Sequence, residues 1–466
     1  MQADSRPLGI GAGAPGTNDI RQEIARRRAE DIKQHGHAQG LELPRKRPFP
    51  VLPFPADPPV ICEIKRCSPS VRNIKMDLDP VMQAGDYVSR GVRNISVLTE
   101  QNYFGGSLGD LAAVKAAFPG TSVLRKDFLL DTEDVEISFR AGADAFLLIA
   151  SLLSSEKLEQ MYRLGISLGM TPLVELHSAE DVRKAAALSP RLVGINSRDL
   201  KSFRINQLQP LKVRALISWD CRIIYESGVK TPGDIAFVRE TGFDGVLVGE
   251  AAVRDEEVAG RLAAAFSKGA GADGPEAENS GSPGRFGFWK KLYSRYRGGR
   301  PLVKICGITN AADLDETVRL GADAAGFILA ESFRRVDAAF IRRCAGADII
   351  KIGVVVLKEG QVVPSEIAAL IDEGILDALQ FHGDERPEEY LKYPGYKALR
   401  LKTEGDAEAA GTQPGPAVLV DAYCREARGG TGKRIDPGLV EKTAALRSLW
   451  LAGGITPDNV FEIITR

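Results

Sequence analysis

Apolar and polar positions repeat along this chain in one order, a short β-branched run followed by a longer helix-like stretch. Eight such runs occur before residue 268, and each predicts a strand of a parallel sheet. They span Val60–Ile64, Asn94–Leu98, Ser122–Leu124, Ala145–Ile149, Pro172–Leu176, Leu192–Ile195, Arg222–Tyr225 and Gly245–Val248. Eight strands joined by helices predict a closed parallel barrel.

The alternation restarts after Pro301 and then gives seven runs. They span Leu302–Ile305, Ala324–Ile328, Ile349–Val356, Ala378–Phe381, Tyr396–Leu399, Ala417–Val420 and Ser448–Leu451. Gly142–Ala145 and Gly321–Ala324 both read Gly-Ala-Asp-Ala just before a strand, so the two parts share an architecture. The predicted fold class is therefore α/β, with two consecutive TIM (βα)8-type barrels, the second lacking its eighth strand and helix.

The missing unit has physical consequences for the second barrel. A barrel unit averages about 31 residues, so about that much chain is absent. The first and seventh strands would keep unpaired edges, which is a liability for stability and aggregation. Two alternatives stay open: the chain is a shortened version of a longer protein, or its second barrel is incomplete and inactive.

Composition shifts divide the chain into four parts. Residues 1–17 form a glycine-rich, flexible N-terminus, 18–267 the first barrel, 268–300 a linker rich in Gly, Pro, Ser and Glu, and 301–466 the second barrel, incomplete at its C-terminal end. A helix is predicted from Asn18, which would cap it, with Ile20, Ile24 and Ile32 on one face. Arg26–Arg28 on this helix is interpreted as a solvated face.

The second half of the linker mixes basic and aromatic residues over Arg285–Tyr293. Single-strand nucleic-acid binders and membrane-surface helices share that mixture. Because the formal net charge of the chain is only -1, a short amphipathic segment that docks on one barrel is the favoured interpretation.

Composition narrows the function class further. Hydrophobic residues make up 44% of the chain and no apolar run is long enough for a membrane helix, so small-molecule partners are expected, without nucleic acid or membrane. The six cysteines are scattered without metal or redox spacing, which predicts reduced thiols and a cytoplasmic location. Fused barrels have less need of a partner, so a monomer is expected.

Two glycine-rich motifs are discounted. Gly11–Gly16 formally matches a dinucleotide fingerprint but has no strand before it. Arg428–Lys433 resembles a P-loop, yet Ala427 and Arg434 occupy its first Gly and its Ser/Thr positions.

Charged residues gather where the strands of the first barrel end. In a parallel barrel these ends open on one mouth, and the period of two sends Glu63 and Lys65 to the same side. The other strand ends add Lys126, Asp127, Glu175, Asn196, Arg198, Glu226, Ser227, Gly228 and Gly249. So many ionisable groups in one mouth predict acid–base catalysis, although a structural ion pair would equally explain Glu63 and Lys65. Gly228 and Gly249 fit a phosphate cup.

Ordered motifs at these strand ends resemble those of the indole-3-glycerol phosphate synthase family. They are Ile61–Ser70, Leu98–Glu100, Tyr103–Gly106, Leu124–Phe128, Val174–Glu175, Gly194–Asn196 and Glu226–Gly228. The resemblance covers roughly residues 18–267. It implies a carbon–carbon lyase that closes the ring of a carboxyphenylamino-deoxyribulose phosphate with loss of carbon dioxide and water. Neither metal nor organic cofactor is implied.

The resemblance also implies residue roles. Lys126 corresponds to the general acid on the substrate carbonyl, Glu175 to its acid–base partner in dehydration, and Lys65 with Glu63 to the network around carboxylate and carbonyl. The implied positioning residues are Asn196, Arg198 and Glu226. Phosphate-loop positions are matched by Ser68, Ser227, Gly228, Gly249 and, through its backbone, Glu250. Phe104 and Phe128 correspond to hydrophobic walls for the anthranilate ring.

The second barrel begins with Lys304-Ile305-Cys306-Gly307, which puts a thiol at the tip of a strand. A lone cysteine of this kind is more often a small buried hydrophobe. An unperturbed thiol has a pKa of about 8.5, so nearby cations could make it a base. Asp421 lies at the tip of the sixth run, and the two together offer the base and acid that an isomerase needs.

The motifs of the second barrel resemble phosphoribosylanthranilate isomerase. They are Lys304–Thr309, Gly326–Ile328, Ser332–Val336, Leu379–Gly383, Val420–Asp421 and Leu451–Ile455. The implied reaction is an Amadori rearrangement that yields the substrate of the first barrel. Cys306 is implied as general base, Asp421 as general acid and Arg334 as the anthranilate carboxylate ligand. Further substrate-binding positions are implied at His382, Gly453 and Gly454.

Three hypotheses about function follow. The first is a bifunctional enzyme of tryptophan biosynthesis with two separate mouths. The second keeps ring closure and makes the second barrel an inactive, structural appendage. The third makes the chain a scaffold or phosphate-ligand sensor, since fold alone does not fix function; it leaves Lys126, Glu175, Cys306 and Asp421 as coincidences.

Overall fold

A computed structural model describes residues 19–69, 71, 73–199, 204–267, 284–423 and 434–465. Several sequence-based predictions lie outside these ranges: the glycine-rich N-terminus, the cap at Asn18, the first half of the linker, Cys424 and the Arg428–Lys433 loop. Among the described residues no helix is long and apolar enough to cross a membrane. The five cysteines there are free thiols.

Eight parallel strands close into the predicted first barrel, with β1 pairing both β2 and β8. The strands are β1 Val60–Ile64, β2 Asn94–Leu98, β3 Ser122–Lys126, β4 Ala145–Ile149, β5 Thr171–Leu176, β6 Leu192–Asn196, β7 Arg222–Glu226 and β8 Gly245–Val248. Predicted and observed bounds differ mainly at the carboxyl ends. Lys126, Asn196 and Glu226 continue the ladder beyond the last apolar residue, because a polar side chain can face the mouth while its backbone stays paired.

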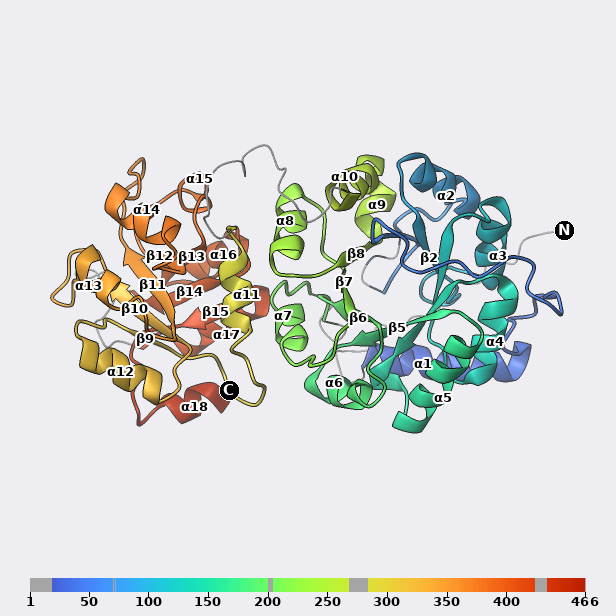
Figure 1. Cartoon of the computed structure of the whole chain (residues 1–466), viewed down its shortest axis with the longest axis horizontal. Helices are drawn as coiled ribbons and strands as arrows, with labels where there is room; N and C mark the ends of the chain where they lie inside the picture. The colour runs from blue at the N-terminus through green and yellow to red at the C-terminus, as the bar shows by residue number, and fades with distance from the viewer. Residues whose placement is uncertain are drawn as a thin grey trace.

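Helices surround this barrel in the alternating order that parallel strands require. They are α1 Ile20–His35, α2 Pro80–Ser89, α3 Leu108–Ala117, α4 Thr132–Ala141, the 3-10 turn η1 Ala150–Leu152, α5 Ser155–Ser167, α6 Ala179–Ala186, α7 Gln209–Arg214, α8 Pro232–Glu240, α9 Glu250–Arg254 and α10 Glu256–Ser267. Figure 1 shows them around the β1–β8 barrel.

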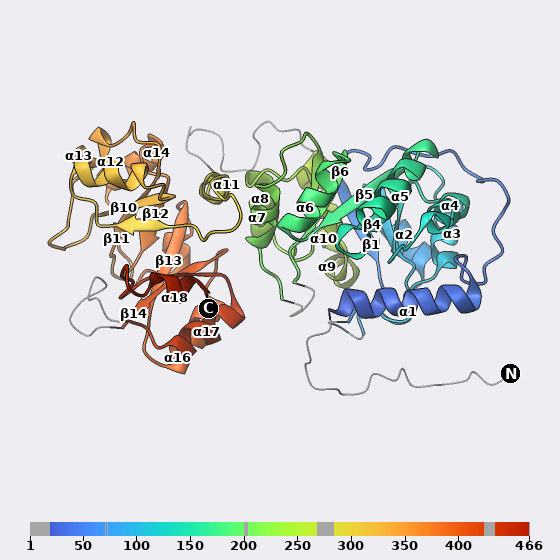
Figure 2. The same ribbon diagram turned by 90° about the horizontal axis from the view of Figure 1, so that it is seen from below.

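Helix α1 lies across one end of the first barrel (Figure 2). Its Ile24 packs in one cluster with Phe104 and Phe128, which follow β2 and β3, so α1 crosses the carboxyl mouth. The cap is Asp19, one residue after the predicted Asn18. The prediction of a solvated Arg26–Arg28 face is wrong for Arg28, which is buried because its guanidinium pairs with Asp134 at 3.0 Å.

The second sheet contains seven described strands, as predicted, in the order β15-β14-β13-β12-β11-β10-β9, and all pairs are parallel. The strands are β9 Lys304–Cys306, β10 Ala324–Ile328, β11 Ile350–Val355, β12 Ala378–Phe381, β13 Gly395–Leu401, β14 Val418–Ala422 and β15 Leu449–Leu451. Its helices are α12 Ala311–Arg319, α13 Ala338–Arg343, α14 Ser365–Asp372, α15 Pro387–Tyr390, α16 Glu404–Thr412, α17 Pro437–Leu446 and α18 Val460–Thr465. Within the described residues β9 and β15 are edge strands, and Ile305 on β9 is exposed.

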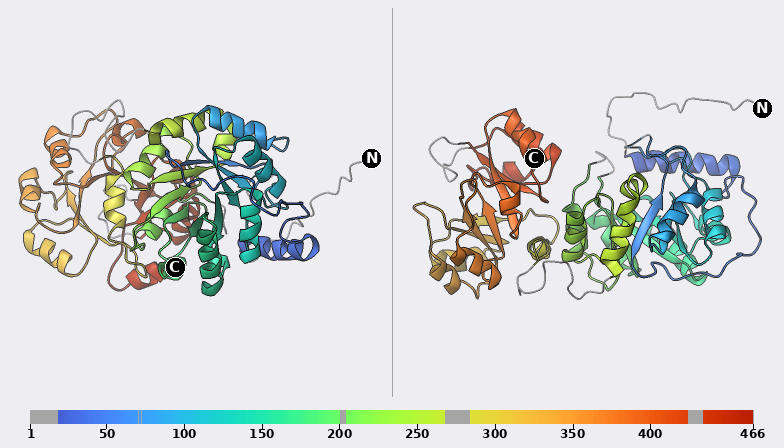
Figure 3. Two further views of the ribbon diagram at one scale, coloured as in Figure 1. Left: turned by 45° about the vertical axis from the view of Figure 1, so that its right-hand side comes forward. Right: turned by 90° about the horizontal axis from the view of Figure 1, so that it is seen from above.

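The aromatic part of the linker forms helix α11, Gly287–Tyr293, which lies between the two barrels (Figures 1 and 3). On the first barrel, the Phe286 ring meets Phe237 of α8 edge-on at 5.3 Å. On the second, the Trp289 ring lies 6.2 Å from that of Tyr396 and 6.5 Å from that of Trp450. The prediction that this segment docks is confirmed, but it docks on both barrels.

Polar contacts repeat this two-sided docking. The backbone N–H of Phe286 donates to Glu240 of α8, and the Lys291 ammonium lies 2.5 Å from a carboxylate oxygen of Asp377. Asp377 immediately precedes β12, so α11 covers the amino end of the second sheet and leaves its carboxyl end open.

We expect Trp289→Ala to lower the free energy of unfolding of the second barrel by about 3–5 kcal/mol, the usual cost of removing a large buried aromatic ring. Trp289 is buried among aromatic rings from α11, β13 and β15. Denaturant unfolding measures the effect. Lys290→Ala, on the exposed side of the same helix, is the control and should change it little. Equal effects of both substitutions would mean that the aromatic contacts do not hold the second barrel.

Candidate active sites

One lysine and two glutamates meet at the mouth of the first barrel. Lys126 ends β3, Glu175 lies on β5 and Glu226 ends β7. The Lys126 Nζ lies 3.1 Å from Glu175 Oε2 and 2.5 Å from Glu226 Oε2. Both carboxylates are buried. The mouth therefore holds two acids that compete for one cation.

The surroundings of Glu175 and Glu226 shift their pKa values in opposite directions. Burial raises the pKa of Glu226, and repulsion from Glu175 and Glu63 adds to this rise while Lys126 opposes it, giving a pKa of about 7. For Glu175 burial also raises the pKa, but the attraction of Lys126 and a hydrogen bond with His177 outweigh it, so the net pKa is lowered. Burial lowers the pKa of Lys126, but the attraction of the nearby carboxylates raises it by more, so the net pKa of Lys126 is raised. The site therefore favours the ionised form of Glu175 and the protonated form of Glu226.

Glu226 occupies a space that a neighbouring glycine provides. A Cβ on Gly194 of β6 would lie 2.0 Å from Glu226 Oε1, so any side chain there would displace the carboxyl group. The same Oε1 is buried without a hydrogen-bond partner among the described residues. An unpaired buried oxygen favours the protonated acid, in agreement with the raised pKa of Glu226.

Because Glu226 binds its proton more tightly in the folded than in the unfolded chain, its contribution to stability falls as pH rises from about 4.5 to 7. We expect Glu226→Gln to remove this loss, so the variant should gain stability relative to the native chain across that window. Thermal unfolding at constant ionic strength measures the difference. Glu159→Gln, at an exposed ion pair with Arg163, is the control. Parallel curves for the native chain and Glu226→Gln would contradict the raised pKa of Glu226.

A second ion pair lies in the same mouth. Lys65 Nζ and Glu63 Oε1 are 2.7 Å apart, as the period of two predicts. The charge of Glu63 also raises the pKa of Lys126 and the pKa of Glu226, so the Lys65–Glu63 pair lies near the Lys126 cluster. A Cβ on Gly249 would lie 2.6 Å from Glu63 Oε1 and 3.0 Å from Lys65 Nζ. The end of β8 therefore packs directly against this pair.

The predicted binding residues line several loops at the mouth. The rings of Phe104 and Phe128 lie 6.3 Å apart, beside α1. Ser227 and Gly228 after β7 both have positive φ, 69° and 78°, which forms a tight turn at the strand end. Gly249 directly precedes α9, and Glu250 pairs with Arg254 at 3.1 Å.

Three other predicted residues stabilise the backbone of loops at the mouth. The Asn196 side chain accepts a hydrogen bond from the N–H of Arg198 at 3.0 Å, and Arg198 bridges Ile205. The hydroxyl oxygen of Ser68 accepts from the N–H of Val71. These contacts fix the conformation of the loops that follow β1 and β6.

His177 is a mouth residue that the sequence analysis missed. Its Nε2 lies 2.7 Å from Glu175 Oε1, on the carboxylate oxygen opposite Lys126. The residue follows Glu175 by two positions, so the alternation that placed Glu63 beside Lys65 could have identified it.

The second mouth presents its predicted base and acid on different strands. Cys306 ends β9 with an exposed thiol, and Asp421 is buried on β14. Burial raises the pKa of Asp421, while an N–H from Ala422 and the charge of Arg400 partly offset the rise. Cys306 is accessible, so the interpretation of this cysteine as a buried hydrophobe is wrong.

Arg334 lies directly beside Cys306. Its Nη1 donates to the Cys306 carbonyl at 3.3 Å, and a Cβ on Gly307 would lie 2.7 Å from the same nitrogen. His382 is buried at the end of β12, with its backbone bonded to Val355. The structure thus brings Arg334 to the backbone of Cys306 and places His382 at the end of another strand.

Gly453 and Gly454 follow β15 with positive φ, 86° and 64°. The Asn459 side chain donates to the carbonyl of Gly454 at 2.8 Å, which joins this turn to the start of α18. The predicted pair of glycines therefore forms a tight turn at the carboxyl end of the last described strand.

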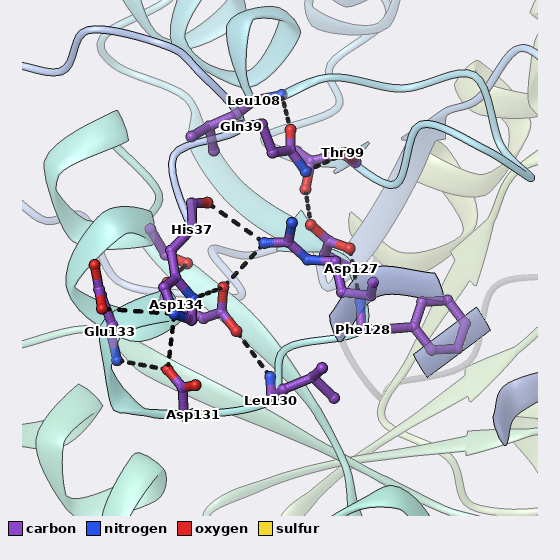
Figure 4. Close-up of polar contacts among 12 residues, drawn as sticks. His37, Gln39, Thr99, Leu108, Asp127, Phe128, Leu130, Asp131, Glu133 and Asp134 are labelled. Atoms are coloured by element: carbon purple, nitrogen blue, oxygen red, sulfur yellow. Dashed lines mark hydrogen bonds and ion pairs between the residues drawn. The ribbon is translucent and has the colours of Figure 1, made fainter. Parts of the chain in front are cut away.

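One group of described residues has the spacing of a metal site, and none of its members was predicted as a mouth residue. His37 Nδ1 lies 2.9 Å from Asp134, and its Nε2 lies 3.7 Å from Asp131 and 3.5 Å from Glu133 (Figure 4). The guanidinium of Arg28 already pairs with Asp134, and its positive charge would repel a metal ion bound at this site. The hydrogen bond to Asp134 raises the pKa of His37 against the effect of burial. The group is best explained as a clamp that holds the end of α1 on α4.

Comparisons with known proteins agree with the two-barrel division. Residues 19–264 match the family described as "Indole-3-glycerol phosphate synthase", and residues 303–466 match the family described as "N-(5'phosphoribosyl)anthranilate (PRA) isomerase". The two matches follow one another in the order of the two sheets.

Individual relatives give the same division. A "Multifunctional tryptophan biosynthesis protein" of Schizosaccharomyces pombe is 30% identical over 446 residues, covering 88% of this chain and 55% of the relative. A protein of the same name from Phycomyces blakesleeanus is 30% identical over 478 residues, covering 88% and 59%. An "Indole-3-glycerol phosphate synthase" of Dehalococcoides mccartyi is 40% identical over 205 residues, covering 44% and 79%. The chain spans less than two thirds of the length of both multifunctional relatives.

Proposed function

This chain belongs to the indole-3-glycerol phosphate synthase family and carries a PRA isomerase-family region in tandem, and from that premise we propose that it catalyses two successive reactions of tryptophan biosynthesis. Residues 301–466 isomerise N-(5-phosphoribosyl)anthranilate to 1-(2-carboxyphenylamino)-1-deoxyribulose 5-phosphate. Residues 18–267 convert that product to indole-3-glycerol phosphate, carbon dioxide and water. The tandem matches and the multifunctional relatives favour this proposal over a single activity with a structural second barrel.

The observation that carries ring closure is the shared lysine at the first mouth. Lys126 contacts two buried carboxyl groups, and its raised pKa means that it enters the reaction protonated. In the proposed mechanism Lys126 donates its proton to the substrate carbonyl as the aromatic carbon attacks it and carbon dioxide leaves. Glu175, ionised and held by His177, accepts a proton in the dehydration that follows. Glu226 then acts as a positioning residue for Lys126.

The remaining residues of the first mouth are assigned to substrate binding. The Lys65–Glu63 pair is assigned to the substrate carboxylate and carbonyl, where a cation stabilises developing negative charge. The backbone at Ser227, Gly228 and Gly249 is assigned to the phosphate, together with Ser68 and the backbone of Glu250. Asn196 and Arg198 are assigned to positioning the substrate. Phe104 and Phe128 form the apolar wall for the anthranilate ring, which fits their place beside α1.

At the second mouth Cys306 removes a proton from the sugar carbon and Asp421 protonates the ring oxygen as the ribose opens. An exposed thiol suits a base that must reach a substrate, and the raised pKa of Asp421 suits an acid. Arg334, beside the Cys306 carbonyl, is assigned to the anthranilate carboxylate, and His382, Gly453 and Gly454 to other parts of the substrate. The free thiols and near-neutral charge fit a cytoplasmic monomer, which is part of this proposal.

The experiment measures each conversion separately with the purified chain, by chromatography of substrate and product. The proposal expects turnover of both substrates. Ring closure without isomerisation would restrict the proposal to the first barrel, and absence of both would overturn it.

A further inference from the structure

Lys304 is a charged residue of the second barrel to which no role has yet been assigned. It lies on β9 two residues before Cys306, so both side chains face the same side of the sheet. The Lys304 ammonium donates to the side-chain oxygen of Gln380 and, at 3.1 Å, to the hydroxyl of Tyr396. The Tyr396 hydroxyl also donates to the same Gln380 oxygen. Gln380 and Tyr396 are both buried, so they enclose the charge.

This charge has no carboxylate partner among the described residues, whereas three other enclosed lysines do. Lys115 pairs with Asp144, Lys126 with two glutamates and Lys397 with Glu385. Burying an ammonium without a counter-charge costs free energy. Such a charge strongly favours the ionised form of any nearby group that can become an anion.

Two such groups act on Lys304: the hydroxyl of Tyr396, whose pKa is raised by burial, and the thiol of Cys306. Gly326 of β10 pairs with Cys306 in the sheet, and a Cβ built on it would lie 2.6 Å from Cys306 Sγ and 2.8 Å from Lys304 Cε. These two distances place Cys306 Sγ within about 6 Å of Lys304 Cε, the carbon that carries the ammonium, and opposite charges that close favour each other's ionisation. The absent side chain of Gly326 is what allows thiol and lysine to approach.

The ionisation of Lys304 agrees with this geometry. Burial lowers its pKa, but the neighbouring Tyr396 and Cys306 raise it more, so the net pKa is raised and Lys304 stays charged. Lys351 of β11 provides a contrast. Its ammonium is held by the carbonyls of Ala347 and Ile349, and burial lowers its pKa.

We propose that Lys304 is a positioning residue of the second mouth, whose ammonium, held by Gln380 and Tyr396, stabilises the thiolate of Cys306. The inference deepens the proposed isomerase, because the thiolate is the form of cysteine that accepts a proton. It also connects the linker helix α11 to the second mouth, because Tyr396 packs against Phe288 and Trp289 of α11 and against Trp450. The helix thus supports, from the amino end of the sheet, the tyrosine that holds Lys304.

The test measures how fast iodoacetamide alkylates Cys306 as a function of pH, by mass spectrometry of the peptide that contains it. Only the thiolate reacts, so the midpoint of the rate reports its ionisation. We expect Lys304→Met to raise this midpoint by about one pH unit or more, and Lys304→Arg, which keeps the charge, to leave it within a few tenths. Lys304→Gln keeps the hydrogen-bonding capacity and replaces Lys304→Met if the latter does not fold.

Lys351→Met is the matched control, since it removes another enclosed lysine of the same sheet and should not move the midpoint. An unchanged midpoint in folded Lys304→Met or Lys304→Gln overturns the proposal, as does an equal shift in Lys351→Met. Alkylation does not depend on turnover, so the pH midpoint of Cys306 can be measured even if the chain has no isomerase activity. If the isomerase is active, kcat/KM of Lys304→Met should fall about tenfold at neutral pH and recover at higher pH, with KM little changed.

Discussion

Lys126→Ala is expected to lower kcat for ring closure by about 10³-fold while isomerisation by the same molecules is unchanged. In the proposed mechanism this lysine supplies the proton for the substrate carbonyl, and it is the cation that both Glu175 and Glu226 contact. Removing it also leaves two buried carboxyl groups without their cation, so some loss of stability is expected. Single-turnover measurement of each conversion at saturating substrate separates the two activities.

The control for Lys126→Ala is Lys115→Ala. Lys115 is fully buried and pairs with Asp144 just before β4, at the amino end of the same barrel. Its removal should reduce stability and leave ring closure per folded molecule within about twofold, because it contacts no group of the mouth. Ring closure retained in Lys126→Ala, or lost equally in Lys115→Ala, would show that Lys126 is not the acid.

Cys306→Ala is expected to lower isomerisation by about 10³-fold and to leave ring closure unchanged. The thiol is the only part of Cys306 that the substitution removes, and it lies at the exposed tip of β9. Cys344→Ala in the same barrel is the control, since Cys344 is buried at the C-terminal end of α13, where burial raises the pKa of its thiol. Comparable isomerase rates for Cys306→Ala and the native chain would exclude Cys306 as the base.

Barrel strands and their mouth residues were predictable because the same apolar run marks both the strand and the point where the mouth begins. A buried parallel strand is an apolar run, and the mouth begins where that run stops, so Lys126, Glu175 and Glu226 could be identified as the polar residues at strand ends. The same rule located Cys306 and Asp421. It underestimated strand length at Lys126 and Glu226, because a polar side chain hides a backbone that is still paired.

Contacts between distant segments were not predictable in the same way. Arg28 looked like part of a solvated basic run, and only the fold brings Asp134 to it, 106 residues later in the chain. Helix α11 read as an amphipathic segment for one barrel, but its ring contacts reach Phe237 on one side and Trp450 on the other. Local pattern reports which face is apolar, whereas the partner of that face depends on tertiary packing.

Lys304 is an intermediate case. Its position two residues before Cys306 is visible in the sequence, and alternation places both side chains on one side of the sheet. The enclosing Gln380 and Tyr396 come from β12 and β13, and the small Gly326 that admits both groups comes from β10. The missing counter-charge, which is what assigns Lys304 a role, is a property of the packed barrel.

The central claim is that two separate mouths perform successive reactions, and mixing the two variants tests it most directly. Lys126→Ala and Cys306→Ala are each supplied with N-(5-phosphoribosyl)anthranilate, alone and together, and indole-3-glycerol phosphate is measured. Neither variant alone should form it at more than a trace, and the mixture should form it after a lag while the intermediate accumulates in solution. A mixture as inactive as either variant alone, with both proteins folded, would contradict two independent mouths.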